Sequence, residues 1–280
     1  MLLPDWYLLC CWGLLGLLVG SFLNVVIHRL PIMLERDWAQ ECAHLRGEEP
    51  TPLPRFNLAV PRSRCPHCGH GIQWYENIPV LSFLVLRARC SQCHTPISWR
   101  YPLVELVTGA LFVYCAQHWG INAQCLVWSF FCAALVAMTL IDWDTTLLPD
   151  DLTQPLLWMG LIASAMHWTA VPLADALAGA VAGYMSLWLV YWGFKFATGK
   201  EGMGYGDFKL FAALGVWFGW QALVPVILIS SVIGAMVGLT LKFTSGLRQG
   251  GQVPFGPFLA GAGLACLFWG PQRLLQLILP

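Results

Sequence analysis

The chain contains 280 residues, of which 58% are hydrophobic and only 11% are charged. About a quarter of the residues in a soluble domain are charged, so this composition excludes an ordinary soluble domain and favours the lipid bilayer as the surroundings of much of the chain. The 15 basic and 15 acidic residues give a net charge of zero. This balance gives no indication of nucleic-acid binding, and we predict none.

Eight apolar stretches are long enough to cross, or nearly to cross, a hydrocarbon core of about 30 Å. The first has no basic residues before it and is longer than the apolar part of a signal peptide, so we expect it to be retained as a span. The sequence therefore predicts an all-α, polytopic membrane protein with about eight transmembrane helices. The stretches lie at 6–27, 103–119, 124–141, 155–170, 174–196, 207–220, 223–241 and 256–278, the sixth being short.

Basic residues indicate how these spans are oriented. All but one of them lie in or beside loops on the same side of the predicted spans: nine arginines from Arg29 to Arg100, then Lys195, Lys200, Lys209, Lys242 and Arg248. Arg273 alone lies toward the other side. Cytoplasmic loops of membrane proteins carry an excess of Lys and Arg. We therefore predict that the N-terminus lies outside and that these loops, together with the loop at 142–154, lie in the cytoplasm.

The one long polar segment, 29–102, contains two C-x-x-C motifs, Cys65 to Cys68 and Cys90 to Cys93. Each motif can place two thiolates on one metal ion, and together they complete a tetrahedral site like that of a zinc ribbon. Two redox-active dithiols are the alternative, but disulfides are rare in a reducing cytoplasm, so zinc is favoured. A closed site of four cysteines is structural and stabilises a segment that has little core of its own.

Four thiolates fill a tetrahedral sphere, so His67, His70 and His94 are expected to be surface residues and not ligands. Cys42 stands alone in the same segment, and we assign it no role. The expected organisation is a first span at 1–28, a cytoplasmic zinc-binding loop domain at 29–102, and a domain with the remaining seven spans at 103–280.

Two acidic residues lie at the cytoplasmic ends of predicted spans: Asp142 follows the third, and Asp207 begins the sixth. Ionisable groups at the bilayer are costly and usually functional. Two carboxylates within a few ångströms share one proton, so one can activate a water while the other donates to a carbonyl, as in aspartic peptidases. Helix capping is the alternative. Gly202, Gly204 and Gly206 favour a site, because glycine permits unusual backbone conformations and close approach of a substrate.

At this point several motifs resemble one family. GMGYGDFKL at 202–210 resembles the G-x-G-D motif of the intramembrane aspartic peptidases, whose bacterial branch is the type IV prepilin peptidases, and IDWDTTLLPDDLT at 141–153 is similar to that family's other aspartate motif. Further segments of this chain are similar to the family's N-terminal signatures. They are the two C-x-x-C pairs, GSFLNVVIHRLP at 20–31, WYENIPVLSFL at 74–84 and SWRYPLVELVTG at 98–109. The resemblance covers nearly the whole chain, in the same order.

The resemblance implies one catalytic aspartate in each motif, and Asp207 is the one in G-x-G-D. In the other motif Asp142, Asp144 and Asp150 compete. The family's essential residue lies seven positions before the Pro of the LPD element, which is Pro149 here, and this selects Asp142. Its position next to the apolar run agrees. We expect Asp150 and Asp151 to cap the following helix instead.

Three further residues are candidates for supporting roles: Gly204, Gly206 and Glu105. Glu105 lies just inside the predicted second span. It either pairs with a nearby arginine such as Arg100, or binds the substrate's amine or a methyl donor, and the sequence does not decide between these two roles.

The resemblance also implies an activity. Such an enzyme removes the leader from type IV prepilins or type II secretion pseudopilins, after a Gly and at the cytoplasmic face of the bacterial inner membrane, with its N-terminus in the periplasm. Family members with a long first loop also methylate the new N-terminus with S-adenosylmethionine. This chain has the long loop and the four cysteines, so we expect both activities. The sequence assigns no methyl-donor residues and no oligomeric state.

Two other functions fit parts of the pattern. A transporter has many spans and membrane acids, but those acids usually lie near the bilayer midplane, whereas Asp142 and Asp207 lie at one rim. A membrane thiol oxidoreductase uses C-x-x-C pairs, but they should face the oxidising side. The predicted topology places these pairs in the cytoplasm.

Overall fold

The computed structural model describes residues 5–48, 54–244 and 253–278, so Arg248 lies outside the described residues. The chain divides into two compact units, Met1–Cys125 and Leu126–Pro280. Among the described residues, helices form nearly all of the regular structure, and β-structure is limited to two isolated bridges, Arg64 with Gly71 and Arg89 with Pro96. The predicted all-α class is confirmed.

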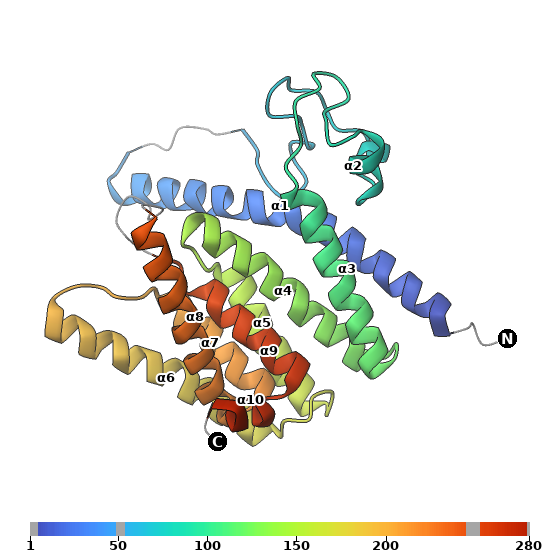
Figure 1. Ribbon diagram of the computed structural model, residues 1–280. Helices are drawn as coiled ribbons and strands as arrows, with labels where there is room; N and C mark the ends of the chain where they lie inside the picture. Colours follow the sequence, from blue (N-terminus) through green and yellow to red (C-terminus); the bar gives the residue numbers. More distant parts are fainter. Residues whose placement is uncertain (1–4, 49–53, 245–252, 279–280) are drawn as a thin grey trace. The chain divides into compact units, whose positions relative to one another are not determined.

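The first unit is built on two packed helices, α1 (Asp5–Leu45) and α3 (Arg100–Trp119). Figure 1 shows α3 crossing the long α1 near its middle. Small residues permit a close crossing: a Cβ on Gly16 would lie 2.8 Å from the Cα of Gly109, and one on Gly20 would lie 2.7 Å from the Cα of Glu105. Any side chain at these glycines would push the helices apart.

Helix α1 is longer than the predicted first span at 6–27, since it continues to Leu45. Residues 32–45 contain no Gly or Pro and are rich in good helix formers. The helix ends shortly before Gly47, which adopts a φ of +70°, as glycines often do after a helix. The domain boundary expected after residue 28 therefore falls inside one continuous helix.

The polar segment that follows is held against α1 by two arginines. Arg29 is buried and donates a hydrogen bond of 2.9 Å to the carbonyl oxygen of Asn57. The guanidinium of Arg36 lies 4.3 Å from the centre of the Phe56 ring, which is a favourable cation–π contact. The rest of the segment contains a 3₁₀ helix, η1 (Trp74–Asn77), and one short helix, α2 (Leu81–Val85).

The second unit surrounds one short helix, α7 (Tyr205–Phe218). Every residue from Asp207 to Trp217 except Lys209 is buried, and α5, α6 and α9 pack against the helix. Its 14 residues span only about 21 Å. The other helical elements that contribute to this unit are α4 (Ala123–Thr145), α5 (Asp150–Ala165), α6 (Leu173–Thr198), η2 (Trp220–Ala222), α8 (Leu223–Phe243), α9 (Gly256–Trp269) and α10 (Pro271–Ile278).

The far end of α7 is fixed by an aromatic cluster. The indole of Trp217 donates a hydrogen bond of 2.9 Å to the carbonyl oxygen of Leu156 in α5. Its ring lies 4.8 Å from that of Phe131 and 4.9 Å from that of Trp128, both in α4. Aromatic pairs at these distances add to the free energy of burial, so α4, α5 and α7 are locked together at this end.

The last apolar stretch, expected as one span at 256–278, forms two helices instead. Gly270 separates α9 from α10 and has a φ of +78°. Pro271 follows it and can begin a helix, but it has no N–H to continue one. The stretch is therefore not a single helix.

Several helices have the length and composition of membrane spans. On the outer faces of α6 and α8, large apolar side chains such as Val181, Leu189, Val232 and Met236 are exposed. Such surface is stable against lipid and unfavourable in water. Among the described residues, four helices are long and apolar enough to cross a membrane: Trp6–Leu45, Ala123–Thr145, Leu173–Thr198 and Trp220–Phe243.

The contact between α6 and α7 gives a test of the fold. A Cβ on Gly179 or on Gly215 would overlap the backbone carbonyl of the other glycine. We expect Gly179→Ala to cost about 1–3 kcal/mol or more, because the backbone cannot yield as a side chain can. Gly193→Ala, in the same helix but facing open space, is the matched control. Thermal unfolding in detergent should show a lower Tm for the first variant only, and equal Tm values would contradict this packing.

Candidate functional site

Asp142 lies in the last turn of α4 and is only 4% exposed. Its Oδ2 accepts a hydrogen bond of 2.9 Å from the backbone N–H of Gly256, the first residue of α9. A buried carboxylate has lost its hydration and needs donors of this kind. Asp144 and Asp150, the two competitors in the same motif, are both exposed. Burial therefore distinguishes Asp142 from its competitors.

Asp207 lies in the first turn of α7 and is 7% exposed. Its Oδ2 accepts a long hydrogen bond of 3.3 Å from the N–H of Gly204, and its Oδ1 is buried without a hydrogen-bond partner among the described residues. Gly206, the residue before Asp207, and Gly256, the donor to Asp142, both closely approach the side chain of Leu148. The structure thus brings the two predicted aspartates together inside the second unit, and it leaves one carboxyl oxygen free to bind a proton or a substrate group.

Leu148, in the loop between α4 and α5, fills the space beside both aspartate segments. A Cβ on Gly206 would lie 2.6 Å from the Cβ of Leu148, and a Cβ on Gly256 would lie 3.1 Å from its Cδ1. The loop after α4, the start of α7 and the start of α9 therefore converge on one point. Glycine at 206 and 256 makes this convergence possible.

The glycines before Asp207 do not adopt the unusual backbone conformations expected of them. Gly204 has a φ of −83° and a ψ of 151°, which any residue can adopt. Gly202 and Gly206 also lack a positive φ. The contribution of Gly206 is close approach to Leu148, and a Cβ on Gly202 would lie 2.9 Å from the Phe194 ring. The expectation of unusual conformation is wrong. Lack of bulk is the physical reason for Gly202 and Gly206, and a Cβ on Gly204 would make only an ordinary contact with Asp207.

The capping role expected of Asp150 and Asp151 is also wrong, because Pro149 is the N-cap of α5. Asp150 instead binds Lys209 of α7, whose Nζ lies 2.6 and 2.7 Å from its two carboxylate oxygens. The Asp150 side chain is 58% exposed, so solvent screens much of this attraction. The pair nevertheless joins α5, which follows the Asp142 segment, to α7, which carries Asp207.

In the first unit, the sulfur atoms of Cys65, Cys68, Cys90 and Cys93 lie within 4.8 Å of one another. The Cys65 and Cys93 sulfurs are 3.7 Å apart, and those of Cys68 and Cys90 are 4.0 Å apart. Metal–sulfur bonds of about 2.3 Å in a tetrahedron separate the sulfurs by about 3.8 Å, whereas a disulfide needs about 2.05 Å. The predicted group therefore assembles, and it can hold a metal ion.

Two similar hairpins present these cysteines. The N–H of Cys65 donates to the carbonyl of His70, and the N–H of Cys90 donates to that of Thr95, both at 2.9 Å. A hydrogen bond from the Thr95 hydroxyl lowers the pKa of Cys93 to about 6, which favours the metal-binding thiolate.

The histidines nearby have other surroundings. His70 bonds the carboxylate of Glu76 at 3.2 Å. His67 and His94 are exposed. None of the three belongs to the four-residue group, as predicted.

The structure gives Glu105 hydrogen bonds within the first unit that the sequence did not indicate. It is buried, and its Oε2 accepts a hydrogen bond of 2.7 Å from the backbone N–H of Val80 and a further one from the Ser21 side chain. Val80 has a φ of +60°, which is strained for a β-branched residue. Glu105 therefore links α1, α3 and the residues before α2.

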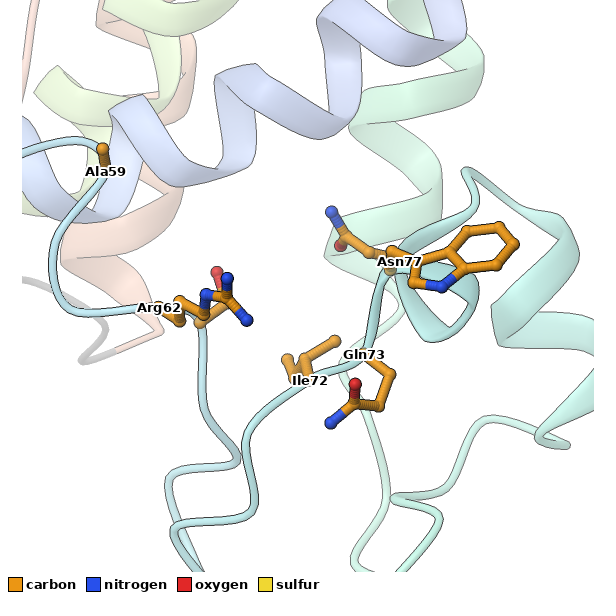
Figure 2. A pocket seen from close by; sticks show the side chains of 7 residues that line it. Ala59, Arg62, Ile72, Gln73 and Asn77 are labelled. Carbon is orange, nitrogen blue, oxygen red and sulfur yellow. The ribbon is translucent and has the colours of Figure 1, made fainter.

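A hollow of about 400 Å³ opens in the polar segment of the first unit. Figure 2 shows Ala59 and Arg62 on one chain segment and Ile72, Gln73 and Asn77 on the facing one. Ser63 and Trp74, a residue that is 80% exposed, complete the lining. The hollow is thus lined by one cation, two amides and an aromatic ring.

Comparison with known proteins finds matches over most of the chain. Residues 14–119 match the model of the bacterial peptidase A24 N-terminal domain, and residues 129–239 match that of the type IV leader peptidase family. The chain is 53% identical to the prepilin leader peptidase/N-methyltransferase of Pseudomonas aeruginosa over 94% of its length and 90% of the relative. The protein of the same name from Stutzerimonas stutzeri is 53% identical, over 96% of this chain and 93% of that relative. The one from Aeromonas salmonicida is 52% identical, over 92% of this chain and 89% of that relative. No solved structure matches the chain.

Fold and site together define a helical membrane protein with a pair of buried aspartates and a four-cysteine group. The matches then identify its family: the chain belongs to the type IV leader peptidase family.

Two features of the site were not predictable from the sequence motifs. Gly256 contacts Asp142 through a backbone N–H, and a backbone donor has no sequence signature of its own. The hollow is lined by exposed side chains from two segments that come together only in the folded chain.

The four-cysteine group can be tested by metal analysis. We expect purified protein to contain about one zinc ion, and the variant carrying both Cys65→Ser and Cys93→Ser to lose it, because two thiolates cannot complete a structural site. The first unit should then lose stability, since metal binding and folding are coupled in such sites. Cys42→Ser changes an exposed cysteine outside the group and should retain the metal. Unchanged zinc content in the double variant would contradict the assignment.

Proposed function

We propose that this protein cleaves the leader peptide from type IV prepilins or type II secretion pseudopilins, after a Gly, and then methylates the new N-terminus with S-adenosylmethionine. Membership of the family supports this, as do relatives named for both activities that align with more than nine-tenths of the chain. The observation that carries the peptidase assignment is the burial of both Asp142 and Asp207 at the point where their segments converge on Leu148.

The proposed hydrolysis uses the pair with one shared proton. The ionised aspartate takes a proton from a water molecule as the water oxygen bonds to the scissile carbonyl carbon, and the protonated aspartate gives its proton to the carbonyl oxygen. In the second step the first aspartate donates the acquired proton to the leaving nitrogen, the C–N bond breaks, and the second aspartate recovers a proton from the tetrahedral intermediate. Both groups return to their starting states.

The proposed topology has eight crossings, with the N-terminus in the periplasm of a bacterial cell and the aspartates at the cytoplasmic face of the inner membrane. Among the described helices, eight have 14 or more residues: α1 and α3 to α9. The basic loops support the orientation. In the proposed organisation residues 103–280 form the peptidase domain, and residues 29–102 form the cytoplasmic domain associated with methylation.

Zinc is the proposed metal of the four-cysteine group. Four thiolates with tetrahedral spacing suit zinc, and a closed site of this kind has a structural role. The cysteines would fix the two hairpins at 64–71 and 89–96 relative to each other. The hollow at Arg62 and Trp74 begins directly beside the first hairpin.

We place the methyl donor in that hollow. Arg62 can bind the carboxylate of S-adenosylmethionine. The Trp74 ring can stack on the adenine or face the sulfonium charge, and the amides of Gln73 and Asn77 can bind hydroxyl or amino groups. When bound, the donor supplies an activated methyl group. A volume of about 400 Å³ is within the range of small-molecule sites.

The peptidase assignment is tested with two variants. We expect Asp142→Asn and Asp207→Asn each to abolish leader cleavage, because an amide can neither hold the shared charge nor exchange the proton. Asp144→Asn, which changes an exposed residue two positions from Asp142, should retain activity. Mass spectrometry of a co-expressed prepilin measures the cut. Full leader removal by either buried variant would refute the role of the pair.

The methyl-donor site is tested by binding. We expect Arg62→Ala to weaken S-adenosylmethionine binding about 10-fold or more, as loss of a charged hydrogen bond does. Calorimetry on purified protein measures this directly. Arg64→Ala removes a neighbouring arginine outside the hollow and should bind normally, and leader cleavage should be normal in both. Equal affinity of the two variants would exclude this hollow as the site.

A further inference from the structure

Helix α9 begins without a cap of its own. Its N-cap residue is Phe255, whose side chain makes no capping hydrogen bond, and Pro257 in the first turn has no N–H. Phe258 donates its N–H back to the carbonyl of Phe255 at 3.1 Å. The N–H of Gly256 is therefore the donor that must find a partner outside the helix, since the first N–H groups of a helix have no intrahelical acceptor.

That partner is Asp142, which lies 114 residues earlier in the chain. The hydrogen bond is buried, and it places the carboxylate at the positive end of the α9 dipole, where a negative charge is stabilised. Both the donor and its position therefore favour the ionised form of Asp142.

Gly256 also controls the space around this carboxylate. A Cβ at this position would lie 2.6 Å from Asp142 Oδ2 and 3.2 Å from its Cγ. A contact of 2.6 Å is far inside van der Waals distance, so any side chain here must displace the carboxylate or the helix. Glycine is thus required for the hydrogen bond to form.

Asp207 is held differently. Its hydrogen bond from Gly204 is longer, at 3.3 Å against 2.9 Å, and its buried Oδ1 has no hydrogen-bond partner in the part of the chain that the structure describes. A buried oxygen without a donor disfavours a full charge. The same oxygen, when protonated, is free to donate to a substrate carbonyl. The two carboxyl groups are therefore not equivalent.

We infer that Gly256 is a positioning residue that holds Asp142 in the ionised, water-activating role and leaves Asp207 to carry the shared proton. This inference rests on the proposed peptidase function. It assigns the first proton transfer, from water to Asp142, and the donation to the carbonyl oxygen, from Asp207. Residue 256 lies outside both segments that match family models, 14–119 and 129–239.

The test compares three glycines of the same helix. Gly256→Ala displaces Asp142. In Gly261→Ala the added Cβ would face open space. In Gly263→Ala it would lie 2.6 Å from the Leu214 side chain, away from the aspartates. Cleavage of a purified prepilin in detergent gives kcat and KM for each, thermal unfolding gives Tm, and methyl transfer to a pre-cleaved pilin serves as a second activity of the same chain.

We expect Gly256→Ala to lower kcat about 100-fold, as a displacement of about 1 Å in a catalytic group does, with KM changed less than twofold and methyl transfer retained. Gly261→Ala should resemble the unchanged protein. Gly263→Ala should lower Tm without a matching fall in kcat. If Gly263→Ala loses kcat as much as Gly256→Ala does, crowding of α9 explains the effect and the inference is wrong.

A second variant removes the donor without adding bulk. Incorporation of glycolic acid in place of Gly256 during cell-free synthesis into nanodiscs changes the amide N–H to an ester oxygen and leaves the site its space. We expect kcat to fall about tenfold or more, the cost of a lost hydrogen bond to a charged group. If Gly256→Ala does not fold, the ester variant alone tests the role of the Gly256 N–H. A normal kcat of the ester variant would overturn the inference.

The outcomes also separate this inference from the proposed function. If Asp142→Asn and Asp207→Asn still cleave, the peptidase assignment itself fails. If both are inactive while the ester variant and Gly256→Ala cleave normally, the pair is catalytic and Gly256 has no positioning role.

Discussion

The buried carboxyl groups of Asp142 and Asp207 set the main constraint on how the helices of the second unit pack. Burial removes the water that would stabilise their charge, and the described hydrogen bonds to them come from backbone N–H groups at helix starts: Gly256 for Asp142 and Gly204 for Asp207. These donors are fixed by the helices themselves. The ends of α4, α7 and α9 must therefore meet at one place, and the glycines at these ends allow them to do so.

The burial of α7 follows from the same constraint. A helix that carries a buried acid in its first turn must be surrounded there, and α7 is surrounded along nearly its whole length. At the middle of the helix this requires backbone contact with α6 at Gly179 and Gly215. At its end the ring of Trp217 fills the space between α4 and α5. The position of Asp207 thus depends on packing along the helix, and the exposed Asp150–Lys209 pair contributes little.

The sequence predicted what depends on local pattern. Burial of Asp142 and Asp207 could be expected because each adjoins a long apolar run, and the four cysteines assemble as their spacing indicates. The length of α1 is also a local property, because nothing in residues 32–45 stops a helix. Tertiary contacts were not predictable: Glu105 accepts a hydrogen bond from the backbone of Val80, 25 residues away. Gly202 and Gly206 serve close packing, which single-sequence reasoning cannot separate from conformational freedom.

Gly256 shows why part of such a site escapes sequence reasoning. Catalytic side chains are recognised by residue type, but a backbone N–H is present at every residue except proline. Position alone makes the Gly256 donor significant: it is unpaired within α9 because the helix begins there, and it is accessible because residue 256 has no side chain. A carboxylate held in this way is oriented by the start of a whole helix. Its geometry therefore depends on where α9 begins, a property set by Phe255 and Pro257 as much as by the aspartate itself.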